Sequence, residues 1–144
     1  MFDPNREDVR RFFCEAWRKR GEALPLTALE TIAADWAAQH PEYHDDLRAA
    51  DDALAADYGP QTGRENPFLH LSMHLAISEQ LSVDQPRGIR DAHEQLARRV
   101  GAHAAAHEVM ECLGEMLWRA QRHGTPPDGE AYVACVRRRA GIAT

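Results

Sequence analysis

Three pairs of histidines separated by four residues are the part of this sequence with the clearest chemical potential. The pairs are His40/His44, His70/His74 and His103/His107, and they use six of the eight histidines in the chain. A spacing of four places two side chains on one face of a helix, one turn apart. Random placement of the same histidines would give about 0.4 such pairs. Because imidazole is a common ligand for zinc, iron, copper and nickel, the excess indicates a transition-metal site.

The second pair lies on an apolar helical face. At about 100° per residue, His70 and His74 fall on one stripe with Ile77 and Leu81. The apolar members of the stripe indicate that this face is buried. We therefore expect both imidazoles to point into the protein interior, where each ring nitrogen needs a partner.

The third pair continues in register to a carboxylate. His103 and His107 share a helical face with apolar residues further along the segment, and Glu111 follows His107 by another four residues. The face is completed by Met110, Gly114, Leu117 and Trp118. Two core-facing histidine pairs on two helices can converge on one ion, and Glu111 is the best carboxylate candidate to join them.

The first pair has a different local context. Pro41 lies between His40 and His44, and proline ends a helix at the residue before it. A shared helical face cannot be assumed for this pair. The fold of the chain can still bring either histidine to the metal site.

We therefore predict a zinc or iron site in a histidine-rich helical protein. The predicted ligands are His70, His74, His103, His107 and Glu111, with His40 and His44 as further candidates. Zinc takes three or four ligands in a tetrahedron, and iron takes more, with carboxylates among them. Whether the protein is an enzyme stays open, and no catalytic residue or small-molecule substrate is identified. In an enzyme, an open coordination position would activate water or oxygen, with Glu115 or Glu79 carrying protons.

A second interpretation needs no metal. Buried histidines can hydrogen-bond to carbonyls, carboxylates or hydroxyls of a neighbouring helix, as in a structural or protein-interaction module. The motifs His-Glu-x-x-His and Glu-x-x-His are absent, and so are glycine-rich phosphate loops. Cys112 follows His107 by five residues, which turns the two side chains apart on a helix, so we expect an inert core cysteine.

Composition and charge limit the other function classes. The chain has 144 residues, 28% of them charged, and a formal net charge of −6, which argues against a nucleic-acid partner. No stretch is apolar enough to span a membrane, and the first residues lack the pattern of a signal peptide. Cys14, Cys112 and Cys135 are far apart and odd in number. We expect buried thiols in a cytoplasmic protein, with a homo-oligomer as one open option.

Proline, glycine and capping residues divide the chain into helices. We expect helices over residues 3–21, 27–40, 68–82, 89–101 and 102–123, with the chain either bending or continuing at Gly101. A last helix begins at residues 125–128, and a short one follows Pro41. Residues 51–58 are compatible with a helix, and residues 59–63 form a loop. Trp17, Trp36 and Trp118 stand at helical core spacings and should pack in the interior. The sequence thus predicts an all-α, single-domain helical bundle of about six helices over residues 1–144.

Long segments of the chain resemble a known family. They are residues 40–44 (His-Pro-Glu-Tyr-His), 66–77 (Asn-Pro-Phe-Leu-His-Leu-Ser-Met-His-Leu-Ala-Ile) and 110–115 (Met-Glu-Cys-Leu-Gly-Glu). Together with the segment from Phe12 to Trp17 and the turn at residues 124–127, they are similar to the proteobacterial family called domain of unknown function eighteen-forty-one. The resemblance covers nearly the whole chain. It implies a bacterial single-domain protein and no established activity.

Overall fold

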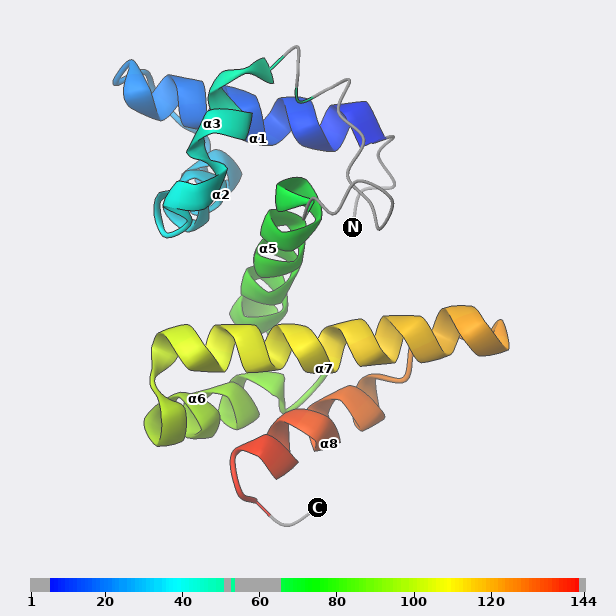
Figure 1. Ribbon diagram of the computed structural model, residues 1–144. Coiled ribbons are helices and arrows are strands. Elements are labelled where there is room, and N and C mark those ends of the chain that lie inside the picture. The colour runs from blue at the N-terminus through cyan, green and yellow to red at the C-terminus, as the bar shows by residue number, and fades with distance from the viewer. Residues whose placement is uncertain (1–5, 51–52, 54–65, 143–144) are drawn as a thin grey trace. The chain divides into compact units, whose positions relative to one another are not determined.

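The described residues of the chain fold into α-helices (Figure 1). The computed structural model describes residues 6–50, 53 and 66–142. Its elements are α1 (Arg6–Gly21), α2 (Ala28–Ala38), the 3-10 helix η1 (Pro41–Tyr43), α3 (His44–Arg48), α5 (Pro67–Val83), α6 (Ile89–Val100), α7 (Ala102–His123) and α8 (Gly129–Arg139). These ranges contain seven α-helices and no strand. The prediction of an all-α fold with about six helices is confirmed.

The helices belong to two compact units. The first unit covers Met1–Ala76 and the second covers Ile77–Thr144, so the division falls within α5. The expectation of one domain over residues 1–144 stays a prediction. The loop expected at residues 59–63, and the helix-compatible stretch 51–58 apart from Ala53, lie outside the described residues.

Helix boundaries follow the capping signals of the sequence. Thr27 and Glu30 form a reciprocal capping box at the start of α2, with N–O distances of 3.1 and 2.9 Å. Gly101 separates α6 from α7 with a φ of +93°, a conformation that glycine adopts at little cost. The Asp128 side chain accepts a hydrogen bond from the backbone N–H of Ala131 and so caps α8.

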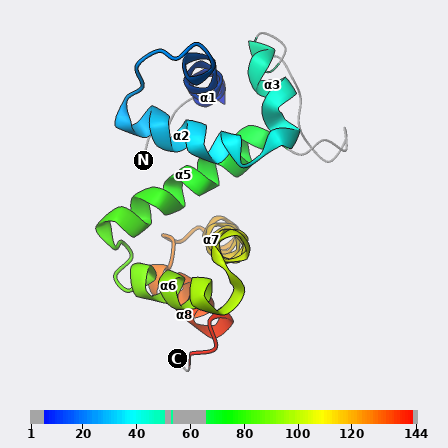
Figure 2. The ribbon, with the colours of Figure 1, turned by 90° about the vertical axis from the view of Figure 1, so that its left-hand side faces the viewer.

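In the first unit, α1 contacts α2 and α3 around an apolar core (Figure 2). Buried residues of that core include Phe13, Ala16, Ala33, Ala37, Tyr43, Leu47, Phe68, Leu71 and Leu75. Arg10 is buried with them, and its guanidinium donates a 2.7 Å hydrogen bond to the Ala53 carbonyl. Burial raises the pKa of the Cys14 thiol to about 11 and keeps it protonated at neutral pH.

In the second unit, α6, α7 and α8 pack against one another. Their buried residues include Ile89, Ala92, Leu96, Ala105, Val109, Leu113, Tyr132, Val133 and Val136. Helix α7 has 22 residues whereas α6 and α8 have 12 and 11. Part of α7 therefore lacks covering helices from its own unit. Leu117 and Trp118 are exposed there, so the expectation that Trp118 packs in the core is wrong.

The cysteines differ from the sequence prediction. Cys112 on α7 and Cys135 on α8 form a disulfide, with their Cα atoms 5.9 Å apart. The expectation of three buried thiols is wrong for these two, and Cys14 is a free buried cysteine as expected. The partners are 23 residues apart on different helices, so their proximity depends on tertiary packing that the sequence pattern does not reveal.

No helix among the described residues is both long and apolar enough to cross a lipid bilayer.

Candidate metal centre

The second histidine pair lies in the first two turns of α5. Asn66 caps this helix, because its Oδ1 accepts hydrogen bonds from the backbone N–H groups of Phe68 and Leu69 at 3.0 and 3.1 Å. Pro67 occupies the first helical position, where the missing N–H costs nothing. The cap and the proline fix where the helix begins. They thereby fix the face on which His70 and His74 lie, one turn apart.

His40 reaches the same place from a separate segment of the chain. It lies between the end of α2 and Pro41, the first residue of η1. The His40 backbone N–H donates to the Ala37 carbonyl at 3.1 Å, and Pro41 prevents the helix from continuing. This helix break holds the His40 ring close to the rings of α5.

The three imidazoles direct the same type of atom toward one another. His40 Nε2 lies 3.1 Å from His74 Nε2, and His74 Nε2 lies 3.2 Å from His70 Nε2. His40 and His74 are 6% and 1% exposed, and His70 is partly buried. Three Nε2 atoms thus surround one small space within the first unit.

A carboxylate sets the proton position of His40. Glu42 Oε1 lies 3.0 Å from His40 Nδ1. A carboxylate accepts hydrogen bonds, so Nδ1 carries a proton, and in the neutral form of the ring the lone pair is then at Nε2. A carboxylate that orients a histidine in this way is a common partner behind metal-binding imidazoles.

The His74 nitrogen has more neighbours than one hydrogen bond can satisfy. An imidazole nitrogen has one in-plane position, which holds either a proton or a lone pair. His74 Nε2 can therefore form a good hydrogen bond with His40 or with His70, but not with both. A cation placed between the rings would attract all three lone pairs at once.

Aromatic side chains surround the cluster. The Trp36 ring stacks on His74 with centroids 4.0 Å apart and an interplanar angle of 12°. Tyr43 stacks on His40 at 5.2 Å. These rings restrict the rotation of the imidazoles and reduce the contact of the nitrogen atoms with water.

His44 is not brought into the cluster. Its Nε2 lies 2.9 Å from the Ala37 carbonyl, to which it donates a hydrogen bond, and its ring stacks on Trp17 at 4.3 Å. The rings of His40 and His44 diverge because one follows α2 and the other begins α3. Sequence spacing alone places both on one face, and the break at Pro41 prevents this.

The third histidine pair lies on α7, in the second unit. His103 is exposed, and His107 Nδ1 is 3.1 Å from the His103 carbonyl oxygen one turn earlier. Glu111 forms a 2.7 Å ion pair with Arg139 of α8. Glu115 pairs with Arg119 at 2.6 Å. The assignment of His103, His107 and Glu111 as ligands stays a prediction from the sequence, and so does proton transfer by Glu115 or Glu79.

Two members of the site were missing from the sequence prediction. Glu42 follows His40 by two residues, so a carboxylate next to the histidine was visible in the chain, but no helical periodicity connects the two. Trp36 was expected only to pack in the core, and it does so directly against a candidate ligand. Its position four residues before His40 was the available signal.

The structure thus defines an all-α protein with a cluster of three histidines in its first unit, two of them buried and one partly buried. A family model described as Domain of unknown function (DUF1841) matches residues 5–138. The chain belongs to this family. No curated protein and no solved structure matches the chain.

Proposed function

We propose that the protein binds a transition metal, zinc or iron, through Nε2 of His40, His70 and His74. The observation that carries this proposal is the convergence of the three nitrogens at spacings of 3.1 and 3.2 Å. Two nitrogens bound to one tetrahedral zinc ion at the usual bond length lie about 3.3 Å apart. The observed spacings are close to this value. Glu42 supports the proposal because it leaves the His40 lone pair directed at the same space.

The alternative function is a structural or interaction module whose histidines hydrogen-bond between helices. It explains the Glu42 contact and one of the two Nε2 contacts. It does not explain why His74 Nε2 has two nitrogen neighbours at hydrogen-bond distance. The metal accounts for both contacts with one interaction.

Three imidazole ligands leave further coordination positions for water or for another ligand. In zinc enzymes the metal ion lowers the pKa of a water bound at an open coordination position, which produces a hydroxide near neutral pH. We infer that a metal-dependent hydrolytic or hydration reaction fits this ligand set better than a closed structural site. His103, His107 and Glu111 remain proposed additional ligands on the strength of their spacing alone.

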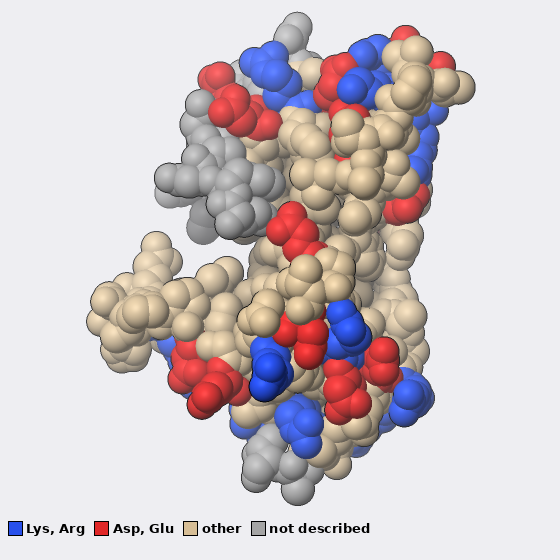
Figure 3. Space-filling model, turned by 180° about the vertical axis from the view of Figure 1, so that it is seen from behind, with Lys and Arg blue, Asp and Glu red and all other residues tan. Residues whose placement is uncertain are grey.

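A cytoplasmic location and the absence of a nucleic-acid partner remain part of the proposal. The net charge of −6 supports it. On the face seen in Figure 3, acidic and basic side chains of the second unit alternate, and no large patch of one sign is present. A nucleic-acid interface would need a continuous basic surface.

Elemental analysis of untagged protein tests the proposal. Protein from minimal medium, purified without chelator, should contain close to one zinc or iron per chain. Stripped protein should take up one equivalent in a calorimetric titration. Background metal content together with no uptake would remove the metal function and favour the interaction module.

A matched variant then separates the two interpretations of His74. In metal-free protein, His74→Ala should reduce thermal stability less than it does in loaded protein, because a metal ligand stabilises only the loaded state. Equal loss in both states would show that His74 is a hydrogen-bonded core residue and would overturn its assignment as a ligand.

A further inference from the structure

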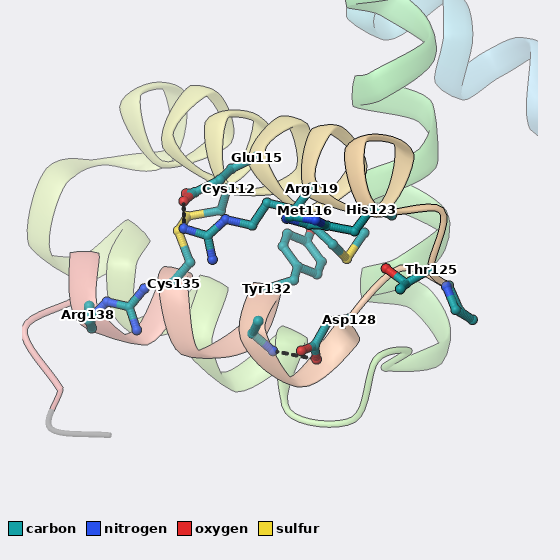
Figure 4. A pocket seen from close by; sticks show the side chains of 13 residues that line it. Cys112, Glu115, Met116, Arg119, His123, Thr125, Asp128, Tyr132, Cys135 and Arg138 are labelled. Carbon is teal, nitrogen blue, oxygen red and sulfur yellow. Dashed lines mark hydrogen bonds and ion pairs between the residues drawn. A yellow bond between two sulfur atoms is a disulfide. The ribbon is translucent and has the colours of Figure 1, made fainter.

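The disulfide of the second unit lines a pocket, and the proposed metal function makes no use of it. The pocket has a volume of about 440 Å³ and lies between α7, α8 and the loop that connects them (Figure 4). This volume is typical of sites for small molecules. Cys112 and Cys135 both contribute to its wall. Most of the remaining wall is a mixture of charged side chains and the faces of Met116 and Tyr132.

Some charged side chains of the pocket have ionic or hydrogen-bonding partners, and one arginine has no ion-pair partner among the described residues. Glu115 and Arg119 form an ion pair with each other, drawn as a dashed line in Figure 4. Asp128 accepts a hydrogen bond from the Ala131 backbone and caps α8 at the opposite end from the disulfide. Arg138 follows Cys135 by three residues on α8, and among the described residues no ion pair engages it. The disulfide end of the pocket therefore offers an available guanidinium.

We propose that the Cys112–Cys135 disulfide is a thiol–disulfide exchange site for a low-molecular-weight thiol that carries a carboxylate. The thiol binds in the pocket with its carboxylate on Arg138, and guanidinium groups bind carboxylates strongly and with defined geometry. Its sulfur then lies next to the disulfide.

The exchange proceeds in two balanced steps. The thiolate of the small molecule attacks Sγ of Cys135, a new sulfur–sulfur bond forms, and the Cys112–Cys135 bond breaks. Its electron pair leaves on Cys112, which takes a proton from solvent. A second thiolate attacks the mixed disulfide and releases the small-molecule disulfide together with the Cys135 thiolate. The small thiol is oxidised and the protein disulfide is reduced to two thiols.

Access decides which sulfur is attacked. Cys135 is 8% exposed and Cys112 is 1% exposed. Exchange requires an approach to the sulfur that is attacked, so the proposal assigns the attack to Cys135, the more exposed of the two residues. Cys112, the more deeply buried of the two, is the leaving group.

The experiment compares mercaptoacetate with its neutral methyl ester on the folded protein. The rate of disulfide reduction is followed by alkylation and mass spectrometry, and each rate is divided by the rate on an unstructured reference disulfide. This division removes the difference in intrinsic reactivity between the reagents. The corrected rate should be at least about threefold higher for mercaptoacetate, a factor expected from one exposed ion pair. In Arg138→Gln the preference should disappear.

Arg98→Gln is the matched control, because Arg98 is an exposed arginine of α6 outside the pocket. It should keep the preference for the anionic thiol. Equal corrected rates for both reagents in the natural protein would overturn the proposal, and so would reduction only after unfolding. Either result would show a disulfide that serves structure alone.

Trapping identifies the attacked sulfur without relying on one variant. Cys112→Ser, treated with the disulfide of mercaptoacetate, should form a stable mixed disulfide on Cys135 faster than Cys135→Ser forms one on Cys112. In the natural protein, acid quenching during reduction followed by peptide mapping should place the adduct on Cys135. An adduct found only on Cys112 would contradict the assigned direction of attack.

Discussion

The histidine pairs His70/His74 and His103/His107 have the same spacing, and each lies near the start of a long helix, yet their contacts within their own units differ. On α5, the His74 nitrogen meets His40 and His70, and Trp36 covers its ring. On α7, the Nδ1 of His107 contacts the backbone of its own helix. The spacing of four defines a common face in both cases. In the first unit, a third imidazole from another segment of the chain, that of His40, reaches that face.

The carboxylates next to the two pairs differ in the same way. Glu42 contacts the imidazole of His40 at 3.0 Å, whereas Glu111 is paired with Arg139 at 2.7 Å. Glu111 matched the four-residue pattern and Glu42 did not. Periodicity along one helix therefore identifies which residues share a face, and the supporting contacts depend on which other segments reach that face.

Removing His74 should have the largest effect. His74 has the central nitrogen of the cluster, so His74→Ala should weaken metal binding by more than about 100-fold, since zinc retains fewer than three ligands. His107→Ala, which the sequence also assigns to the site, should weaken binding less. Calorimetric titration of both variants measures the difference, with His123→Ala as a control that should bind normally. Equal losses of metal affinity in His74→Ala and His107→Ala would mean that both histidine pairs contribute equally to metal binding.

The second-largest effect is expected from removal of the metal, which should lower the free energy of unfolding. A ligand bound only by the native state adds about 4 kcal/mol to the free energy of unfolding when its free concentration is a thousand times its dissociation constant. Chemical denaturation of loaded and stripped protein measures this difference. An unchanged midpoint after confirmed loss of metal would mean that neither histidine pair holds an ion in the folded state.

Exchange of one carboxylate for an amide compares the two supporting groups. Glu42→Gln should reduce metal affinity about 10- to 100-fold, because a neutral amide oxygen is a weaker acceptor than a carboxylate for the His40 Nδ1 proton. Glu111→Gln should have a smaller effect, since its carboxylate is engaged by Arg139. Competition with a chromogenic chelator measures both affinities. A greater loss of affinity in Glu111→Gln would mean that Glu111, the residue predicted from the sequence, supports metal binding more than Glu42 does.

The smallest effect is expected from the aromatic support of the first unit. Trp36→Leu removes the ring stacked on His74 and should weaken metal binding by a few-fold, in line with the energy of about 1 kcal/mol for one aromatic pair. Trp118→Leu is the matched control in the second unit, because Trp118 is exposed on α7. If both variants bind metal equally well, the stacked ring has no part in positioning the ligand.

Helix positions were largely predictable from local residues. The bounds of α7 agree with the expected segment because Gly101 and Gly124 mark both of its ends with positive φ angles. The capping box of Thr27 and the cap and proline at Asn66 and Pro67 likewise depend on neighbours in the chain. Such signals act within one turn, so they can be read without the tertiary structure.

The candidate site was predictable only in part. His70 and His74 share an element, and their spacing reveals their common face. His40 joins them across 34 positions, and the Cys112–Cys135 bond joins two helices across 23 positions. Contacts of this range depend on how helices pack, and a single sequence carries no local pattern for them.

The distance along the chain between His40 and His74 also affects the kinetics of folding. The two segments must come together, and the loop between them must close, before any ion can meet all three nitrogens. Burial of the apolar core of the first unit therefore has to offset the entropic cost of that closure, because the ion is not yet bound to all three nitrogens. An ion that arrives after this step does not accelerate folding and instead slows the escape from the folded state. Bound metal would therefore lower the unfolding rate of the first unit and leave its folding rate unchanged.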